Sequence, residues 1–170
     1  NAGQNGKVSG ITNEEVAENS SPLGTTITPN TGYEFSHWIA NTNLTLTNGT
    51  IIQTGQPVSV DNLKQVVVTT TITFTAQYIK ATYTINYTSN EYGTITGITT
   101  ETKKYLESPT GTTIAVADSE YSFSHWIANK DVQLKDETTI KKGEKITPEN
   151  ISNIIVNSNI TFTADRKSVV

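Results

Sequence analysis

The chain has 170 residues, no Cys and a formal net charge of −4. The absence of Cys excludes a disulfide framework, a thiolate nucleophile and a Cys-ligated metal. Its 12 Lys and Arg are dispersed among 16 Asp and Glu. Affinity for nucleic acid comes mainly from clustered cations, so no nucleic acid partner is expected. No apolar stretch approaches the ~18 residues of a membrane span, so membrane insertion is not expected either.

The strongest compositional bias is towards Thr, with 31 residues, and Asn, with 16. Thr favours β-strands and Asn favours turns. Met is absent, and no long segment shows the helical spacing of apolar residues. We therefore expect a mostly β protein, at the margin between all-β and α+β.

The first element with a clear pattern is FSHWIAN at residues 35–41, which we predict to be a strand. Neighbouring side chains of a strand point to opposite faces. The segment would then present two sets of side chains, with Phe35, His37 and Ile39 on one face and Ser36, Trp38 and Ala40 on the other. Because each face carries a large apolar group, we expect both faces of this strand to be covered.

The Ser–His pair of this segment raises the question of chemistry. Adjacent strand residues diverge, so Ser36 and His37 are not expected to form the hydrogen bond that a nucleophile and its base require. A metal site is not expected, because each half of the chain has one His and no suitably spaced acid joins it. We interpret His37 and its repeat His125 as half-buried packing residues. A pH-sensing role is the alternative.

The next elements are a short helix and two strands. Residues 59–63 combine Ser59 at the N-cap with an early acid, and we predict a helix of about two turns. Apolar residues alternate with polar ones, mainly Thr, over 71–78 and again over 82–88. This alternation predicts two strands with apolar side chains inward and Thr outward.

The whole pattern is then repeated. FSHWIAN recurs at 123–129, and nine of the 14 positions of 33–46 are identical in 121–134. The offset is 88 from there onward and 87 upstream, so the second copy has one extra residue in a polar turn between Ile114 and Tyr121. A second short helix is predicted over 147–151, with Thr147 at the N-cap and Pro148 at the first helical position.

A period of 88 exceeds the ~20–50 residues of solenoid repeats and indicates two small domains in tandem. We call residues 1–80 module one and residues 81–170 module two. No Gly-, Ser- or Pro-rich linker separates them, so we expect a semi-rigid junction. Module two has a strand ahead of Gly93 that module one lacks ahead of Gly6. Either this strand is truncated, as in a fragment of a longer array, or another chain supplies it at an open sheet edge.

Acidic residues gather at 14–15, 118–120 and 136–137, in predicted turns. Calcium is an ion that such turns can bind, but none has the D-x-D-x-D-G spacing of an EF-hand loop. We interpret these acids as solvated turn residues. No metal, no cofactor and no paired-carboxylate catalytic site is expected.

The order of motifs in module two is TYTINYTSNEYGTITG, GTTIAV, YSFSHWIAN and NITFTA. This order resembles the divergent form of the internalin B-type repeat of Gram-positive surface proteins. That family has a first strand, a Gly-flanked hairpin, a G-Y-x-F-x-x-W strand and a closing T-x-T-A strand. The matching residues are Gly32, Tyr33, Phe35 and Trp38 in module one, and Tyr121, Phe123 and Trp126 in module two.

Module two departs from this pattern at two positions. Glu120 replaces the Gly, and Arg166 replaces the closing aromatic, which is Tyr78 in module one. In both modules a His stands where the family usually has a Gly before the Trp. The resemblance implies small β-rich modules, sandwich-like or β-grasp-like, repeated along exported stalks and adhesins. It implies no catalytic residues.

The expected function is a non-catalytic extracellular repeat module that serves as a stalk or spacer of a bacterial cell-surface or cell-wall protein. Its expected partners are neighbouring repeat modules of the same chain. The alternative is an adhesive module that contacts a host glycoprotein, matrix protein or glycan. Adhesion needs exposed aromatic side chains, and Tyr92 and Tyr105, which have no counterpart in module one, are expected to be exposed. An enzyme is not expected, because no nucleophile–base or metal constellation is recognisable.

Overall fold

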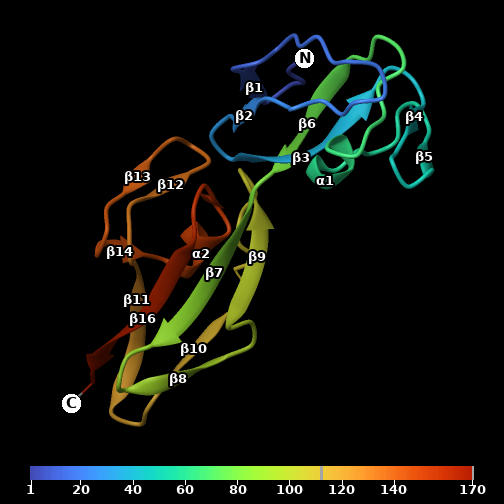
Figure 1. Ribbon diagram of the computed structural model, residues 1–170. Helices are drawn as coiled ribbons and strands as arrows, with labels where there is room; N and C mark the ends of the chain where they lie inside the picture. The colour runs from blue at the N-terminus through green and yellow to red at the C-terminus, as the bar shows by residue number, and fades with distance from the viewer. Residues whose placement is uncertain (112, 170) are drawn as a thin grey trace. The chain divides into compact units, whose positions relative to one another are not determined.

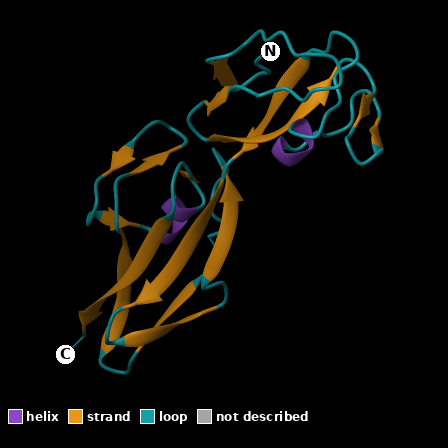
Figure 2. Ribbon diagram, viewed as in Figure 1, coloured by secondary structure: helices purple, strands orange, loops and turns teal. Residues whose placement is uncertain are grey.

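The computed structural model describes residues 1–111 and 113–169. The chain divides into two compact units, Asn1–Lys80 and Ala81–Val170. Among the described residues, each unit consists of strands and loops with one four-residue helix (Figures 1 and 2). The predicted mostly β fold with two tandem modules is confirmed.

Module two is built on a five-stranded mixed sheet with the strand order β14-β11-β16-β7-β9. The central strand β16 runs antiparallel to β11 and parallel to β7, and β7 runs antiparallel to β9. The first and last strands of the module are therefore parallel neighbours (Figure 1). The strands of this sheet are β7 (Thr82–Ser89), β9 (Thr100–Lys104), β11 (Tyr121–Ala128), β14 (Lys145–Ile146) and β16 (Ile160–Ser168).

Smaller elements complete module two. One antiparallel pair and one three-stranded antiparallel sheet accompany the main sheet. A single helical turn follows β14 in the sequence and precedes the last strand of the small sheet. The pair is β8 (Gly93–Thr96) with β10 (Ile114–Ala117), the small sheet is β12 (Val132–Leu134), β13 (Thr139–Ile140) and β15 (Ile154–Ile155), and the helix is α2 (Pro148–Ile151).

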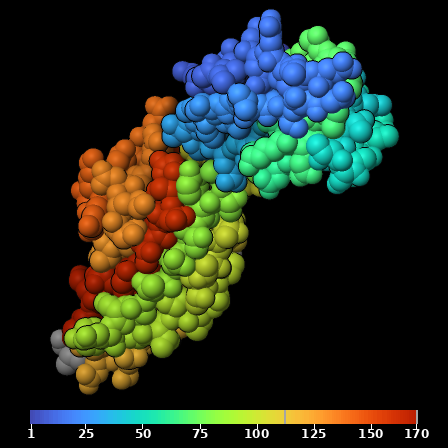
Figure 3. Space-filling model, viewed as in Figure 1, coloured from blue at the N-terminus to red at the C-terminus, as the bar shows by residue number. Residues whose placement is uncertain are grey.

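Module one repeats part of this plan. Its main pair is the counterpart of β11 and β16, and among its residues no strand corresponds to β7 or β9. In Figure 3 the first residues of the chain, in dark blue, lie on the outside of this module. Its elements are β1 (Gly6–Ser9) with β2 (Thr26–Pro29), β3 (Tyr33–Ala40) with β6 (Phe74–Lys80), β4 (Leu44–Thr45) with β5 (Ile51–Ile52), and α1 (Val60–Leu63).

Each Trp lies in the core of its module. Trp126 is 2% exposed and Trp38 is 3% exposed. In module two the ring of Tyr87 packs edge-on against Trp126 and is stacked on Phe162, with both ring centroids 5.6 Å away. Burial of such large aromatic side chains is a major source of folding free energy. The heptapeptide is therefore core material in both copies.

A β-bulge interrupts the heptapeptide strand in both modules. The register of β3 with β6 shifts between Phe35 and His37, and that of β11 with β16 shifts between Phe123 and His125. An extra residue at a bulge reverses the alternation of side chains beyond it. The predicted faces are therefore wrong for Phe35, whose ring lies 5.5 Å from that of Trp38 and packs against the same core cluster.

Both predicted helices form, but each spans four residues, about half the predicted length. Ser59 caps α1 as expected, because its hydroxyl accepts a hydrogen bond of 3.0 Å from the main-chain N–H of Asn62. Thr147 has the extended backbone of an N-cap, yet its side chain makes no capping hydrogen bond. Pro148 leaves one fewer N–H to cap, which is consistent with this difference.

The closing strands of the two modules use different side chains for one contact. In module two the buried Arg166 donates hydrogen bonds of 3.1 Å to the carbonyl of Thr94 and 2.9 Å to that of Val116. In module one the Tyr78 hydroxyl donates a bond of 3.2 Å to the carbonyl of Lys7, the counterpart of Thr94. Module two thus continues in strand conformation to Ser168, despite losing the closing aromatic.

A glycine makes room for each of these side chains. A Cβ atom at Gly6 would lie 2.1 Å from the ring of Tyr78, and one at Gly93 would lie 2.6 Å from Nε of Arg166. Gly93 also has a φ of +152°, which side chains rarely adopt. A side chain at this position would collide with the closing-strand residue in both modules, and at Gly93 also with the carbonyl of Val116, 2.1 Å from the Cβ position.

This substitution pattern yields a prediction for Arg166. Arg166→Ala should lower the stability of module two by about 2–4 kcal/mol, because several buried carbonyls lose a charged donor. Arg166→Tyr should cost less than half as much, since a tyrosine can reach the carbonyl of Thr94 as Tyr78 reaches that of Lys7. Urea unfolding of the full chain, followed by NMR peaks of module two, measures both. Equal losses for the two variants would contradict this account.

Candidate functional site

The Ser and His side chains of each heptapeptide lie close together at the bulge, although a regular strand would hold them apart. The hydroxyl of Ser36 lies 2.9 Å from Nδ1 of His37, and that of Ser124 lies 2.9 Å from Nδ1 of His125. The prediction that adjacent strand residues cannot make this contact is wrong, because it assumed a regular strand. Both imidazoles are half-buried, as expected for packing residues.

In module two a carboxylate also approaches this pair. Oδ2 of Asp165 lies 3.7 Å from Nδ1 of His125, the same nitrogen that contacts Ser124. A catalytic triad places its nucleophile and its carboxylate on opposite ring nitrogens, so that one nitrogen takes the proton of the nucleophile while the other donates its N–H to the carboxylate. Here both partners share Nδ1. In module one, Gln77 occupies the position of Asp165.

Two of the three predicted acidic clusters, 118–120 and 136–137, lie in or beside turns, whereas the prediction of a turn is wrong for Glu14 and Glu15, which lie in an irregular loop segment. One carboxylate oxygen of Asp136 accepts a hydrogen bond of 3.0 Å from the main-chain N–H of Thr138, which is a local turn contact. Asp118 and Glu120 are exposed. Within 1–111 and 113–169, no group of three or more His, Asp or Glu side chains is close enough to bind a metal ion.

The two aromatics expected to be exposed differ in their environment. Tyr92 is 42% exposed, and its ring is stacked on that of Tyr121, with centroids 4.2 Å apart and planes inclined by 8°. Tyr105 is half-buried. The outward aromatic feature of module two is therefore this tyrosine pair, beside the turn between β7 and β8.

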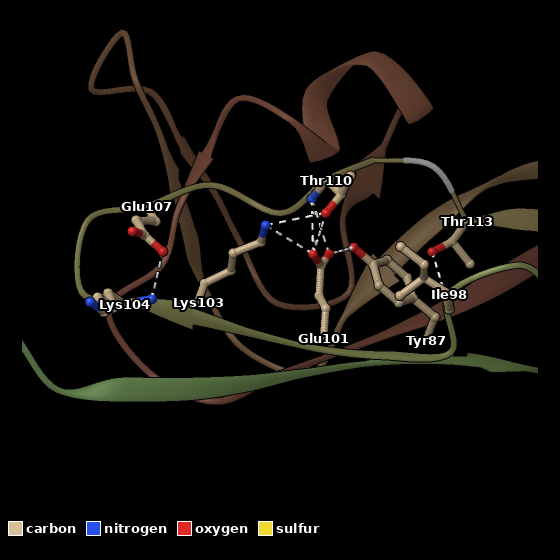
Figure 4. A network of polar contacts seen from close by, with 8 residues as sticks. All are labelled: Tyr87, Ile98, Glu101, Lys103, Lys104, Glu107, Thr110 and Thr113. Atoms are coloured by element: carbon tan, nitrogen blue, oxygen red, sulfur yellow. Dashed lines mark hydrogen bonds and ion pairs between the residues drawn. The ribbon is translucent and has the colours of Figure 1, made fainter.

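A polar network that the sequence analysis missed surrounds Glu101 on β9 (Figure 4). The Tyr87 hydroxyl donates a hydrogen bond of 2.7 Å to Oε1 of Glu101. The main chain and the hydroxyl of Thr110 donate to the same carboxylate, and Nζ of Lys103 lies 3.2 Å from Oε2. The Glu101 side chain is 9% exposed. Through Glu101, the network connects Tyr87 of β7 with Thr110 of the loop that follows β9.

Burial and hydrogen bonding set the charges of this network. Burial raises the pKa of the Tyr87 hydroxyl well above its usual value, and its contact with Glu101 raises it further. Burial alone would also raise the pKa of Glu101, but hydrogen bonds from Thr110 and Tyr87 outweigh it and hold the pKa of Glu101 below its usual value. At neutral pH the pair is therefore a neutral phenol donating to a carboxylate.

Module one contains half of this network. Glu14 is the counterpart of Glu101 at the offset of 87, and its carboxylate accepts a hydrogen bond of 3.0 Å from the main-chain N–H of Leu23, the counterpart of Thr110. No residue of the described chain corresponds to Tyr87 in module one. The shared Glu could have been found from the sequence, because the offset that aligns the hairpins also aligns Glu14 with Glu101.

A cleft of about 670 Å³ opens beside Glu14. Its apolar lining includes Trp38, Leu63 and Phe74, and its polar lining includes Glu14 and Thr12. In module two, the corresponding position beside Tyr87 and Trp126 retains a void of only about 10 Å³. The cleft of module one is the candidate functional site of the chain, because it combines apolar walls with a carboxylate acceptor.

The Glu101 network makes a prediction about pH. A carboxyl group whose pKa is lowered by folding stabilises the folded protein at pH values above about 4.3, its pKa in the unfolded chain. This stabilisation disappears as the pH falls through the pKa of the group in the folded protein. Glu101→Gln should therefore cost about 1–3 kcal/mol at pH 7 and clearly less at pH 3. Urea unfolding of the full chain at both pH values, read from NMR peaks of module two, measures the difference.

Glu14→Gln is the matched control for this experiment. The carboxylate of Glu14 accepts main-chain hydrogen bonds in an exposed setting and has no phenol partner. Its substitution should change the stability of module one by less than Glu101→Gln changes that of module two. A cost of Glu101→Gln that is the same at pH 7 and pH 3 would contradict the assignment of the charge.

Comparison with known proteins adds one positive finding. The family model described as the divergent InlB B-repeat domain matches the chain twice, over residues 1–81 and 83–165. No curated protein and no solved structure matches the chain. Over the part of the chain that the structure describes, no helix has the length and apolar character needed to cross a bilayer.

The two matches cover nearly the whole chain and coincide with the two units of the structure. The same bulged strand, the same pair of hairpin strands and the same Gly at the closing-strand contact recur in both. The chain therefore belongs to the divergent InlB B-repeat family and consists of two consecutive copies of its domain.

Proposed function

We propose that the two modules form a non-catalytic spacer in the extracellular stalk of a bacterial cell-surface protein, anchored to the cell wall of a Gram-positive organism. The observation that carries this proposal is the direct joining of the two modules. The last strand of module one, β6, ends at Lys80, and the first strand of module two, β7, begins at Thr82. Only Ala81 lies between them.

A junction of one residue restricts the rotations open to the chain. Flexible linkers contain many Gly and Ser residues, and their end-to-end distance varies widely. Two strands joined through a single Ala have few soft dihedral angles between them. A spacer that holds a binding region away from a surface benefits from such a stiff connection, and neighbouring repeat modules are its natural partners.

The geometry of the Ser–His pairs supports a role without catalysis. Ser124 and Asp165 approach the same imidazole nitrogen of His125, so the ring cannot take the proton of the hydroxyl at one nitrogen while the other nitrogen donates its N–H to the carboxylate. In module one the carboxylate is replaced by Gln77. The repeated heptapeptide contributes its Trp and Phe rings to the cores instead.

Adhesion is a second candidate function, which the tyrosine pair of module two favours. Exposed aromatic side chains are common at the centres of binding sites for proteins and glycans. Tyr92 and Tyr121 form a stacked, partly exposed pair, and Asn5 replaces Tyr92 in module one. The partner would be a host glycoprotein, a matrix protein or a glycan.

The spacer proposal predicts a narrow range of distances between the modules. Because the chain has no Cys, spin labels can be attached selectively at Asn48→Cys and Lys142→Cys, two exposed turn positions. We expect a narrow distance distribution by double electron–electron resonance, and a clearly broader one after insertion of six Gly and Ser residues between Lys80 and Ala81. A native distribution as broad as that of the insertion variant would refute the stiff junction.

The adhesion proposal predicts binding that depends on Tyr92. If the pair is a contact site, the full chain should bind to components of a glycan array or a panel of purified matrix proteins, and Tyr92→Ser should abolish that binding. Tyr121→Phe keeps a stacked ring and should retain most of it. Absence of binding by the unmodified chain, or binding that Tyr92→Ser leaves intact, would remove adhesion at this pair.

A further inference from the structure

Two strands that hold the same place in the two modules differ in the chemistry of their edges. Strand β10 of module two pairs with β8 along one edge, and the sheet order places no strand at its other edge. In module one, β2 pairs with β1 in the same way. An unpaired edge presents N–H and C=O groups that can accept another strand, and proteins commonly block such edges with Lys or Pro.

The pairing registers show which residues of β2 and β10 correspond. Thr26 faces Ser9 in module one, and Ile114 faces Thr96, the counterpart of Ser9, in module two. Thr26 therefore corresponds to Ile114, at an offset of 88. The extra residue of module two must then lie ahead of Ile114. Its predicted position between Ile114 and Tyr121 is wrong, because that position was set by sequence identity and not by strand pairing.

The edge strand of module one is blocked. The exposed side chains of β2 are Thr26 and Thr28, and Lys7 of β1 faces Thr28 across the pair and is exposed as well. Pro29 ends β2, and a proline has no main-chain N–H to donate to a further strand. A polar face with a cation and a proline at the edge are both devices that discourage pairing with another chain.

The edge strand of module two has lost these devices. Ile114 and Val116 stand where module one has threonines, and they are 61% and 44% exposed. Ala117 stands in the place of Pro29, and β10 contains no charged residue. The strand thus turns its two large apolar side chains outward and its two small ones, Ala115 and Ala117, toward the module. Apolar side chains gathered on a surface in this way mark an interaction site.

The free main-chain groups of β10 belong to its two alanines. In an antiparallel pair, residues bonded to the partner strand alternate with residues whose N–H and C=O point away from it. The N–H of Asp118 donates a hydrogen bond of 3.1 Å to the carbonyl of Tyr92, so Val116 belongs to the bonded set. Ala115 and Ala117 belong to the other set, and no main-chain hydrogen bond from elsewhere in the described chain reaches them.

We propose that the β10 edge is a self-association site, at which the chain pairs with a second copy of itself. The two β10 strands run antiparallel about a two-fold axis at Ala115, whose N–H and C=O bond to those of Ala115 in the other copy. On the outward face, Val116 of each copy then lies opposite Ile114 of the other, so that four apolar side chains meet. This association is independent of the spacer role and of adhesion at the tyrosine pair.

The residues of this edge favour a second copy over a partner chosen by charge. A basic or an acidic peptide would find no charge of opposite sign in β10. Two copies of β10 carry no like charges that would repel each other across the pair, and each places an aliphatic side chain opposite an aliphatic one. Because only a few apolar side chains meet, we expect a weak dimer with a dissociation constant of about 0.1–1 mM.

Sedimentation equilibrium of the full chain tests the association. The unmodified chain should be a monomer at about 10 µM and increasingly a dimer towards about 1 mM. Val116→Lys should abolish the dimer, because it places two cations in a small apolar contact. Thr28→Lys, the same change at the matching position of module one, should leave it intact. A chain that stays monomeric near 1 mM, or equal effects of the two substitutions, would overturn the proposal.

Ala117→Pro tests whether the edge itself makes the contact. The N–H of Ala117 points away from β8, and module one carries a proline at the same place, so the fold should be retained, as its NMR spectrum would show. The dissociation constant of the dimer should rise roughly tenfold or more, because each copy loses one main-chain donor at the contact. Unchanged association of a folded Ala117→Pro variant would refute pairing through this edge.

Single-cysteine variants test the register of the two strands. Residues 114 and 116 of opposite copies form a non-hydrogen-bonded pair in the proposed dimer, and their Cα atoms would lie about 4.5 Å apart, within the range of a disulfide. The chain has no other Cys. A mixture of Ile114→Cys and Val116→Cys should therefore form a mixed disulfide dimer on mild oxidation, and either variant alone should form far less. Equal cross-linking in the mixture and in the separate variants would overturn this pairing.

Discussion

The closing strand of each module has two edges, and the rest of the module depends on what pairs with them. In module two, β16 bonds to β11 on one side and β7 on the other, and the side chains of all three strands meet over Trp126. Because main-chain groups removed from water must find partners, the closing strand can be central only when both neighbours are present. In module one the closing strand β6 is paired with β3 along one edge, and the apolar side chains beside its other edge are half-buried.

Much of this architecture could be predicted from the residues. The alternation over 82–88 correctly put Ile85 and Tyr87 inside, and the Ser59 cap and the missing first strand of module one were both readable from the repeat. The β-bulge could not be predicted, because it depends on how the strand meets its neighbour and not on a local motif. At the bulge the ring of Phe35 packs against that of Trp38, and Oγ of Ser36 lies 2.9 Å from Nδ1 of His37. The predicted faces of the strand and the predicted separation of Ser36 from His37 were both wrong, because both assumed a regular strand. The length of the helices also depends on tertiary structure: each ends at a residue that is buried in the core, Leu63 in α1 and Ile151 in α2.

The candidate site was only partly visible in the sequence. Alignment of the two modules pairs Glu14 with Glu101, and this identity marks a position that both copies retain. Its meaning appears only in the structure, where Glu101 accepts hydrogen bonds from Tyr87 and Thr110, and Glu14 lines an open cleft. A cleft left by an absent strand has no motif of its own. It became interpretable because the chain carries a second module in which the same place is filled.

The parallel pairing of β7 and β16 also determines how module two would respond to tension. These are the first and last strands of the module, so a pull on its two ends acts along both strands in opposite directions. All the hydrogen bonds between them are then loaded at once, in shear, instead of opening one after another as in an unzipping hairpin. A domain whose first and last strands pair in this way resists extension along the line that joins its two ends.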